Sequence, residues 1–149
     1  DGFAILKVGP WLTFALREAL YGLDAVADVL SGHPPRGRLL ATMERAMQEA
    51  PEHWQGHYAG DPSALWAQRH FSLSDRIRYY WPSPEARAAV DDLMQRLGKR
   101  QIPGPLLRQY LPGRTAMAEP CDAHTALILA VQDVLAMYAH ATEPGESAR

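Results

Sequence analysis

Apolar and polar residues follow each other along this chain with two different periods. The first run, Phe3-Ala-Ile-Leu-Lys-Val8, is apolar on both alternating faces except at Lys7, which predicts a buried strand over residues 3–8. A strand that is apolar on both faces is typical of a parallel sheet covered on both sides. Gly9-Pro10 follows, and a proline is well suited to the first turn of a helix. The pattern therefore predicts a strand, a short turn and a helix.

From residue 11 onward the spacing becomes that of amphipathic helices. Over residues 11–30 the apolar positions repeat every three or four residues, and most charged residues fall outside the apolar stripe. These charged residues are Arg17, Glu18, Asp24 and Asp28. The same periodicity, with serine, proline and glycine start and stop signals, predicts further helices at 36–50, 62–71, between Ser83 and Gly98, at 106–110 and at 122–141.

The predicted fold is therefore mainly α, with one N-terminal strand followed by about six helices. We expect one domain, in which residues 1–34 hold the strand and its helix, residues 35–141 form a helical extension, and residues 142–149 are a polar tail. No second convincing strand pattern follows, and a parallel strand needs partners. Since residue 1 is not methionine, we expect the chain to be the carboxyl-terminal part of a longer protein.

Composition narrows the classes of function. With 149 residues, 47% of them hydrophobic, the chain is long enough for a substantial core. A net charge of -2 and a sequence pI near 6.3 argue against nucleic acid or an anionic membrane as a partner. No apolar run approaches membrane-spanning length. Cys121 is the only cysteine, so an intrachain disulfide is excluded and a cytoplasmic location is expected.

The end of the predicted strand is a candidate phosphate site. Lys7 places a charge near the carboxyl end of the strand, where open sheets and barrels bind their ligands. Gly9 allows close backbone approach, and the free N–H groups of the next helical turn, with the Thr13 hydroxyl, suit a phosphate. The alternative is that Lys7 reaches out to water and Gly-Pro is an ordinary connector.

Residues 72–81 form the most unusual segment of the chain. Its serines and Asp75 suit the start of a helix, and the spacing of its side chains is helical. Arg76, Arg78 and Tyr79 would suit a clamp on a sugar phosphate, because arginine forks onto phosphate and tyrosine donates to hydroxyls. The alternative is structural: Asp75 pairs with Arg78 while the aromatic residues pack this segment onto neighbouring helices.

Two histidines form a weaker candidate site. His53 and His57 are four residues apart, which on a helix would place both rings on one face, as two ligands of a zinc or iron site require. Gly56 weakens a helix here, and no glutamate lies between them in the order of the zinc-protease motif. The alternative is a pair of polar aromatic residues in a packed loop, and we predict no metal in this chain.

Several blocks of the sequence resemble the non-catalytic, GatZ/KbaZ-type subunit of class II D-tagatose-1,6-bisphosphate aldolase, in its carboxyl-terminal portion. The similarity covers nearly the whole chain, and departs at Gly104 and in the loops 31–38 and 113–121. The blocks are Phe3-Ala-Ile-Leu-Lys-Val-Gly-Pro10, Leu12-Thr-Phe-Ala-Leu-Arg-Glu-Ala-Leu20, Pro51-Glu-His-Trp-Gln-Gly-His-Tyr58, Ser74-Asp-Arg-Ile-Arg-Tyr-Tyr-Trp-Pro82, Ile102-Pro-Gly-Pro-Leu106 and Gln109-Tyr-Leu-Pro112.

The resemblance implies an aldolase-type (β/α)8 barrel in which residues 3–8 form the last strand. It also implies a role in galactitol or N-acetylgalactosamine catabolism, as an accessory subunit that supports the activity and stability of the catalytic aldolase subunit. Zinc and the cleavage of tagatose bisphosphate then belong to that catalytic partner, so this chain carries no cofactor and no catalytic residue. An oligomer is expected. Some relatives are thought to act alone as C4 epimerases of ketohexose phosphates.

Three functions from different classes remain open at this point. The first is the accessory subunit, with the helices after residue 35 as its interface. The second is an epimerase, whose base and oxyanion stabiliser would have to lie upstream of this chain. The third is a helical assembly module with no ligand.

Overall fold

A computed structural model describes residues 8–111, 113 and 119–142 of the chain, and its elements are helical. They are α1 (Trp11–Leu30), α2 (Arg38–Glu49), the 3-10 turn η1 (Pro51–His53), α3 (Pro62–Phe71), the 3-10 turn η2 (Arg76–Tyr79), α4 (Pro84–Leu97), α5 (Gly104–Tyr110) and α6 (Ala123–Thr142). Within these residues the β-structure is limited to one antiparallel bridge between Ile102 and Cys121. The mainly α part of the predicted fold class is therefore confirmed.

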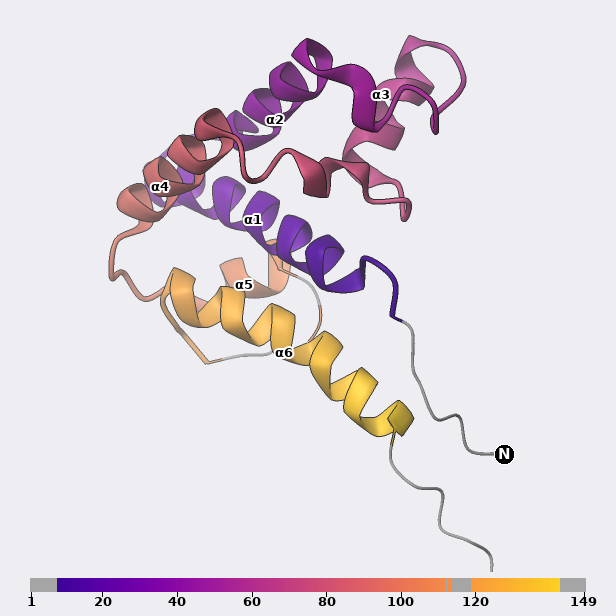
Figure 1. The fold of residues 1–149 in the computed structure, drawn as a ribbon. Coiled ribbons are helices and arrows are strands. Elements are labelled where there is room, and N and C mark those ends of the chain that lie inside the picture. Colours follow the sequence, from indigo (N-terminus) through magenta and orange to yellow (C-terminus); the bar gives the residue numbers. More distant parts are fainter. Residues whose placement is uncertain (1–7, 112, 114–118, 143–149) are drawn as a thin grey trace, which may run out of the picture.

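Helix α1 lies at the centre of the molecule. It contacts α2 and α4 on one side and α5 and α6 on the other, while α3 packs against α2 and η2 (Figure 1). Because neighbours surround α1 over most of its length, its buried positions extend beyond the predicted apolar stripe. Helices α2, α4, α5 and α6 are thus placed by direct packing on α1.

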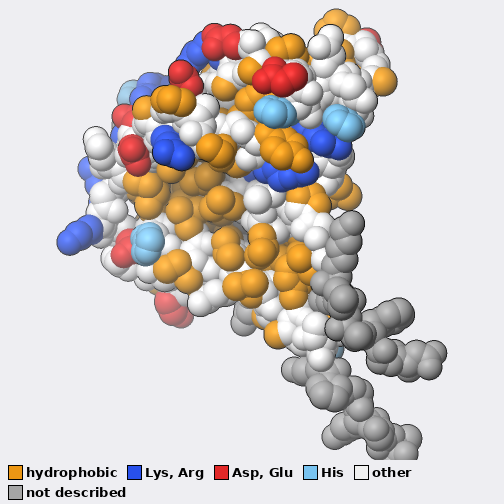
Figure 2. All heavy atoms as spheres, viewed as in Figure 1, with side chains coloured by type: hydrophobic (Ala, Val, Ile, Leu, Met, Phe, Trp, Pro, Cys, Tyr) orange, Lys and Arg blue, Asp and Glu red, His pale blue; other side chains and the backbone are white. Residues whose placement is uncertain are grey.

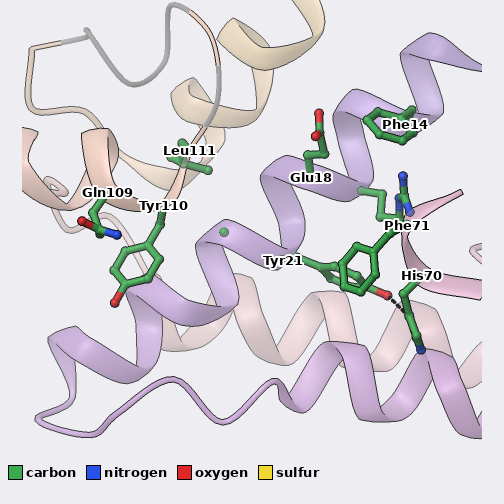
Figure 3. Close-up of a pocket in the computed structure, with 10 residues that line it drawn as sticks. Phe14, Glu18, Tyr21, His70, Phe71, Gln109, Tyr110 and Leu111 are labelled. Carbon is green, nitrogen blue, oxygen red and sulfur yellow. Dashed lines mark hydrogen bonds between the residues drawn. The ribbon is translucent and has the colours of Figure 1, made fainter. Parts of the chain in front are cut away.

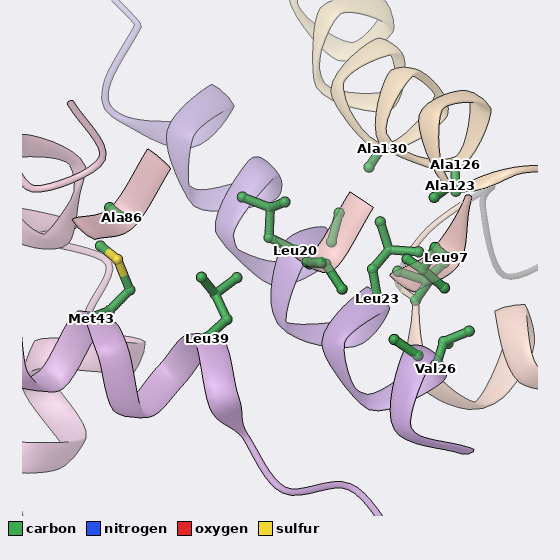
Figure 4. Close-up of a cluster of buried hydrophobic side chains, with 14 of the residues drawn as sticks. Leu20, Leu23, Val26, Leu39, Met43, Ala86, Leu97, Ala123, Ala126 and Ala130 are labelled. Atoms are coloured by element: carbon green, nitrogen blue, oxygen red, sulfur yellow. The ribbon is translucent and has the colours of Figure 1, made fainter. Parts of the chain in front are cut away.

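The hydrophobic core forms where α1 meets its neighbours (Figure 4). Leu23 and Val26 of α1 are fully buried, and so is Met43 of α2. Burying a side chain of this size contributes about 1.5–3 kcal/mol. On the other side, α6 presents small residues to α1, which allows the two helix backbones to approach closely; these residues are Ala123, Ala126 and Ala130.

Gly22 lets α1 and α5 approach still more closely. A Cβ atom added at Gly22 would lie 2.2 Å from the carbonyl oxygen of Tyr110 and 2.8 Å from Cδ2 of Leu111. Real Cβ contacts essentially never fall below 3.0 Å. Glycine is therefore required here by tertiary packing rather than by backbone conformation.

Three charged residues of α1 are buried, so the prediction that they lie outside the packed face was wrong for them. Arg17, Asp24 and Asp28 are 2%, 2% and 1% exposed, whereas Glu18 is exposed as predicted. Buried charges require hydrogen-bonding partners, and the two aspartates have them. Asp24 accepts from the backbone N–H of Leu39 at 3.0 Å and from Arg96 Nη2 at 2.7 Å.

Asp28 in turn accepts from the backbone N–H of Arg36 at 2.8 Å. The aspartates of α1 thus satisfy backbone groups at and before the start of α2, whose N-cap residue Gly37 contributes no side-chain cap. Arg96 brings α4 to the same carboxylates. These charges fix how α1, α2 and α4 pack together.

The predicted helix boundaries agree with the structure within a few residues, except over residues 72–81. That segment contains only the 3-10 turn η2, because Ser72 adopts an extended conformation that ends α3 and the Asp75 side chain binds α1. The predicted strand 3–8 lies outside the described residues except for Val8, which has no regular secondary structure and is exposed. Of the predicted tail, only Thr142 is described, as the last residue of α6.

Helix α6 is long and apolar enough to cross a membrane by length and composition alone. Core helices of soluble proteins pass the same test but are mostly buried, whereas 17% of the apolar window of α6 is buried; its buried residues are Ala123, Ala126, Ala130 and Val134. The packing of α6 on α1 accounts for the apolar character of these buried residues.

Candidate functional site

Asp75 links the start of α1 to the segment that carries the predicted arginine clamp. Its carboxyl group is buried, with Oδ2 at 2.8 Å from Thr13 Oγ1 and Oδ1 at 3.3 Å from Arg17 Nε. Its backbone carbonyl accepts a hydrogen bond of 2.7 Å from Arg78 Nη1. The structure therefore brings Thr13 and Arg78, two of the predicted site residues, to the two sides of Asp75.

The electrostatics of this cluster favour a surplus of positive charge. Burial raises the pKa of Asp75, while its hydrogen bond to Thr13 and the charges of Arg17 and Arg78 act to lower it. Thr13 Oγ1 also lies 2.8 Å from the carbonyl oxygen of Pro10, so its single proton is donated to one of two acceptors at a time. The carboxyl group of Asp75 thus lies beside Arg17 and within reach of the charge of Arg78, and it is easier to protonate than usual.

Of the other residues of the predicted phosphate site, the structure describes Gly9, which lies just before α1. Lys7 lies outside the described residues. Gly9 is exposed and lines a pocket of about 560 Å³ together with Trp11, Phe14 and Leu73. The predicted phosphate site at Lys7, Gly9 and Thr13 remains a prediction, and the observed position of Gly9 leaves its backbone accessible.

Arg76 and Arg78 point to different partners. Arg78 donates from Nη2 to the Tyr79 hydroxyl at 2.7 Å, and its guanidinium carbon lies 4.3 Å from the centroid of that ring. Arg76 Nη2 lies 3.1 Å from Nδ1 of His57. Arg78 binds the backbone carbonyl of Asp75 rather than its carboxylate, so the pairing of the structural alternative is met only in part, and the sugar-phosphate clamp remains a prediction.

His53 and His57 do not share a helix face, because the chain after η1 forms turns. His53 packs against the rings of Tyr79 and Tyr80, with centroids at 5.0 and 5.5 Å, whereas His57 meets Arg76. Among the described residues, no group of three or more histidine, cysteine, aspartate or glutamate side chains could hold a metal ion. The helical spacing considered for the histidine pair was therefore wrong.

A pocket of about 620 Å³ lies beside Asp75, against the middle of α1 (Figure 3). We call it the Arg17 pocket. The side of α1, the end of α3 and the end of α5 form its walls. It is lined by Phe14, Arg17, Glu18, Tyr21, Gly22, His70, Phe71, Gln109, Tyr110 and Leu111. Its size is that of small-molecule sites in general, which range over about 300–1,000 Å³.

Arg17 is the unusual residue of this pocket. Its side chain is 2% exposed and stacks on the Phe14 ring, with 4.3 Å between the guanidinium carbon and the ring centroid. Among the described residues neither Nε nor Nη1 has a hydrogen-bond partner, although both atoms are buried. The sequence pattern missed Arg17 as a site residue, because a lone arginine outside an apolar stripe usually lies in solvent.

A chain of hydrogen bonds leads from the pocket into the molecule. The Tyr21 hydroxyl lies 2.8 Å from His70 Nδ1, and His70 Nε2 lies 3.0 Å from Glu44 Oε2 (Figure 3 shows the first contact). Glu44 also accepts from Arg69, whose Nε is 2.8 Å from Oε2. No sequence motif joins these residues, which come from α1, α2 and α3.

Burial governs how this chain titrates. It raises the pKa of Tyr21 and lowers the pKa of His70. Burial acts to raise the pKa of Glu44, but Arg69 and His70 together, through their hydrogen bonds and charges, lower that pKa. Near neutral pH the chain is thus a neutral tyrosine and a neutral histidine beside an ionised Glu44–Arg69 pair.

The sequence matches one protein family over residues 1–143, that of the D-tagatose-1,6-bisphosphate aldolase subunit GatZ/KbaZ-like proteins. The chain belongs to the GatZ/KbaZ-like family. The resemblance found in the sequence blocks is therefore confirmed at the level of the family, which is described by its relation to D-tagatose-1,6-bisphosphate aldolase.

Two relatives of the GatZ/KbaZ-like chain carry more specific names. A protein of Agrobacterium fabrum (strain C58 / ATCC 33970), named D-tagatose 6-phosphate 4-epimerase, is 52% identical over 147 residues, which are 97% of this chain and 34% of that protein. A crystal structure described as a probable tagatose 6 phosphate kinase from Sinorhizobium meliloti 1021 matches with a TM-score of 0.84 and 50% identity, covering 95% of this chain and 38% of that one. The chain thus spans about a third of each relative.

Proposed function

We propose that the protein carrying this chain acts on D-tagatose 6-phosphate as a 4-epimerase. The observation that supports this most is the 52% identity to the Agrobacterium fabrum protein of that name, which extends over 97% of this chain. The relation of the family to tagatose-bisphosphate aldolases is consistent with the proposal, because both activities concern phosphates of the same ketohexose.

The chemistry of a 4-epimerase explains why it would share a scaffold with aldolases. C4 of a 2-ketohexose is not adjacent to the carbonyl carbon, so its proton is not acidified by that carbonyl. Breaking the C3–C4 bond gives an aldehyde and an enediolate, and joining them again on the other face of the aldehyde inverts C4. An aldolase breaks the same bond. This route needs an acid–base pair and an oxyanion stabiliser, which we assign to parts of the protein outside this chain.

Within this proposal, the described helices hold the start of α1 in place. Asp75 ties Thr13 to the η2 segment, so the backbone at Gly9 and the first turn of α1 are positioned from the helical side. A phosphate bound by Lys7, Gly9 and Thr13, with that turn at the end of the last strand of a (β/α)8 barrel, fits this arrangement. Arg76, Arg78 and Tyr79 lie on the same segment and belong to the proposal as supporting residues.

The test is direct. The full-length protein is incubated with D-tagatose 6-phosphate alone, and the mixture is followed by NMR for D-fructose 6-phosphate, the C4 epimer. We expect interconversion in both directions with no other substrate added. Product formation that requires ATP would instead support a kinase, and no change in the sugar phosphate under either condition would refute the proposal.

A second function is favoured by the family description as an aldolase subunit. In this role the protein would stabilise a catalytic aldolase subunit that binds zinc, in cytoplasmic catabolism of galactitol or N-acetylgalactosamine, and would form an oligomer with it. Figure 2 shows hydrophobic side chains gathered in a band across one face of the molecule. Large exposed apolar residues that such a partner could cover include Trp11, Leu73, Ile128 and Leu135.

This second function is tested by assaying the catalytic aldolase subunit with and without the full-length protein. An accessory subunit lengthens the half-life of the aldolase and raises its activity in proportion to the amount added, up to a fixed ratio. The Leu73→Glu variant, which adds charge to a side chain 78% exposed, should weaken the effect without unfolding the protein. An aldolase that is unchanged by the wild-type protein would refute the accessory role.

A further inference from the structure

Arg17 is a buried cation whose hydrogen-bonding capacity is not used by the described residues. A guanidinium group carries five N–H donors and stays charged at all physiological pH values. In this structure its nearest carboxylate oxygen, Asp75 Oδ1, is 3.3 Å from Nε without a hydrogen bond, and Nη1 is buried without a partner. Burying a charge that is poorly paired costs several kcal/mol. The site therefore favours an additional acceptor.

The charges around Arg17 indicate what kind of acceptor is missing. Within the part of the chain that the structure describes, Asp75 is the carboxylate paired with Arg17, and it is also held by Thr13 and by the charge of Arg78. Arg78 donates its hydrogen bond to the backbone carbonyl of Asp75 and not to the carboxyl group, so the charges of two guanidinium groups lie near one carboxylate. Glu18 also lines the pocket, but it is exposed to solvent. A second anion at Arg17 would balance the cluster.

The shape of the pocket suits a small oxyanion rather than a lone chloride or a peptide. Its volume of about 620 Å³ holds more than a monatomic ion, and the Phe14 ring covers one face of the guanidinium. The planar edge of a guanidinium binds phosphate or carboxylate through two parallel hydrogen bonds. The hydroxyl of Tyr21 and the carboxamide of Gln109 belong to pocket-lining residues that can meet sugar hydroxyls.

We propose that the Arg17 pocket binds the phosphate group of a sugar phosphate, with Arg17 as the residue that contacts it. The proposal rests on the proposed function for the class of ligand, while the oxyanion site itself rests on the buried guanidinium. The pocket shares Phe14 and Glu18 with the pocket that Gly9 lines, and its other α1 residues lie at least about one helical turn beyond Thr13. The pocket holds the phosphate, and no chemical step is assigned to it.

The experiment measures binding of inorganic phosphate and of D-tagatose 6-phosphate to the full-length protein by isothermal titration calorimetry. Loss of a charge-assisted pair predicts that Arg17→Gln binds both roughly ten- to a hundredfold more weakly. Arg17→Lys, which keeps the charge but loses the fork, should be intermediate. Arg100→Gln, an exposed residue outside the pocket, removes the same charge and should change binding less than about twofold.

A second variant gives a change of opposite sign and does not touch the buried cation. Glu18→Gln removes a negative charge from an exposed pocket residue, so it should leave the fold intact and tighten phosphate binding by roughly two- to fivefold. This variant keeps the proposal testable if Arg17→Gln unfolds the protein. Unchanged binding in a folded Glu18→Gln variant counts against an anion in the pocket.

The outcomes separate this site from the epimerase activity, which is assayed on the same preparations. Weaker phosphate binding in Arg17→Gln supports the site even if wild-type protein shows no epimerase activity. Epimerase activity with unchanged phosphate binding in the same variant overturns the site and leaves the proposed function standing. If Arg17→Gln lowers the unfolding temperature while wild-type protein binds no phosphate, an acceptor elsewhere in the full-length protein occupies Arg17, and the proposal fails.

Discussion

Replacing Gly22 by alanine tests the packing of α1 on α5. In an exposed helix this change stabilises by about 1 kcal/mol, because alanine is the better helix former. Here the new Cβ would lie 2.2 Å from the Tyr110 carbonyl oxygen, against a lower limit of 3.0 Å for real contacts, so the two backbones must separate by at least about 0.8 Å. Overpacking of this kind costs about 1–3 kcal/mol. With Leu111 also in contact, we expect a net loss of about 2 kcal/mol.

Urea unfolding followed by far-UV circular dichroism measures this loss as a lower midpoint with an unchanged slope. The matched control is Gly56→Ala, since an added Cβ at Gly56 meets nothing within 4 Å and its backbone is not in the left-handed region. It should leave the midpoint unchanged or raise it slightly. If Gly22→Ala is as stable as wild type or more so, the close approach of α1 and α5 is wrong.

Three further predictions concern charges and caps. Burial lowers the pKa of His70 below its ordinary value of 6.5. The contribution of neutral His70 to stability is therefore complete above about pH 6.5 and is lost as the pH falls through the lowered pKa. The His70→Gln variant should flatten the decline in the free energy of unfolding between about pH 7 and 5. Asp24→Ala removes the buried acceptor of the Leu39 N–H and one of the carboxylates that bind Arg96, and should cost about 3 kcal/mol in urea unfolding. Arg38→Ala removes a half-exposed cation from Asp28, which keeps its bonds to the Arg36 N–H and Arg96, and should cost less than about 1 kcal/mol. Ser83→Ala removes the cap of α4 and should lower stability by about 1 kcal/mol, and an unchanged urea midpoint would contradict that role.

The helices themselves could be read from the sequence with good accuracy. Residues 11–30 and 62–71 match α1 and α3 at both ends, because periodic apolar positions and local signals such as Gly-Pro or Asp-Pro act within a few residues. The failure at residues 72–81 has a specific cause. The side chains of this segment have helical spacing in the sequence. In the structure, however, the Asp75 side chain binds Thr13 and lies beside Arg17 of α1 instead of capping an α-helix.

The candidate site residues also divide into those that the sequence indicated and those that only the structure brought together. The sequence indicated the start of α1 and the two arginines near Tyr79, since unusual residues in a dense segment are visible in one dimension. It did not indicate Arg17, Tyr21 and His70, because each is unremarkable among its neighbours along the chain. They converge only when α3 packs against α2 and α5 against α1.

The sequence alone thus determined the family of the chain, its mainly helical class and most helix boundaries, all of which depend on residues close together along the chain. The tertiary structure decided which charges are buried and what they meet. Arg17, Asp24 and Asp28 look like solvent-facing charges on a single helix, yet all three are buried. The physical reason is that α1 has neighbours on several sides, and burial of a charge depends on partners that are far away in sequence.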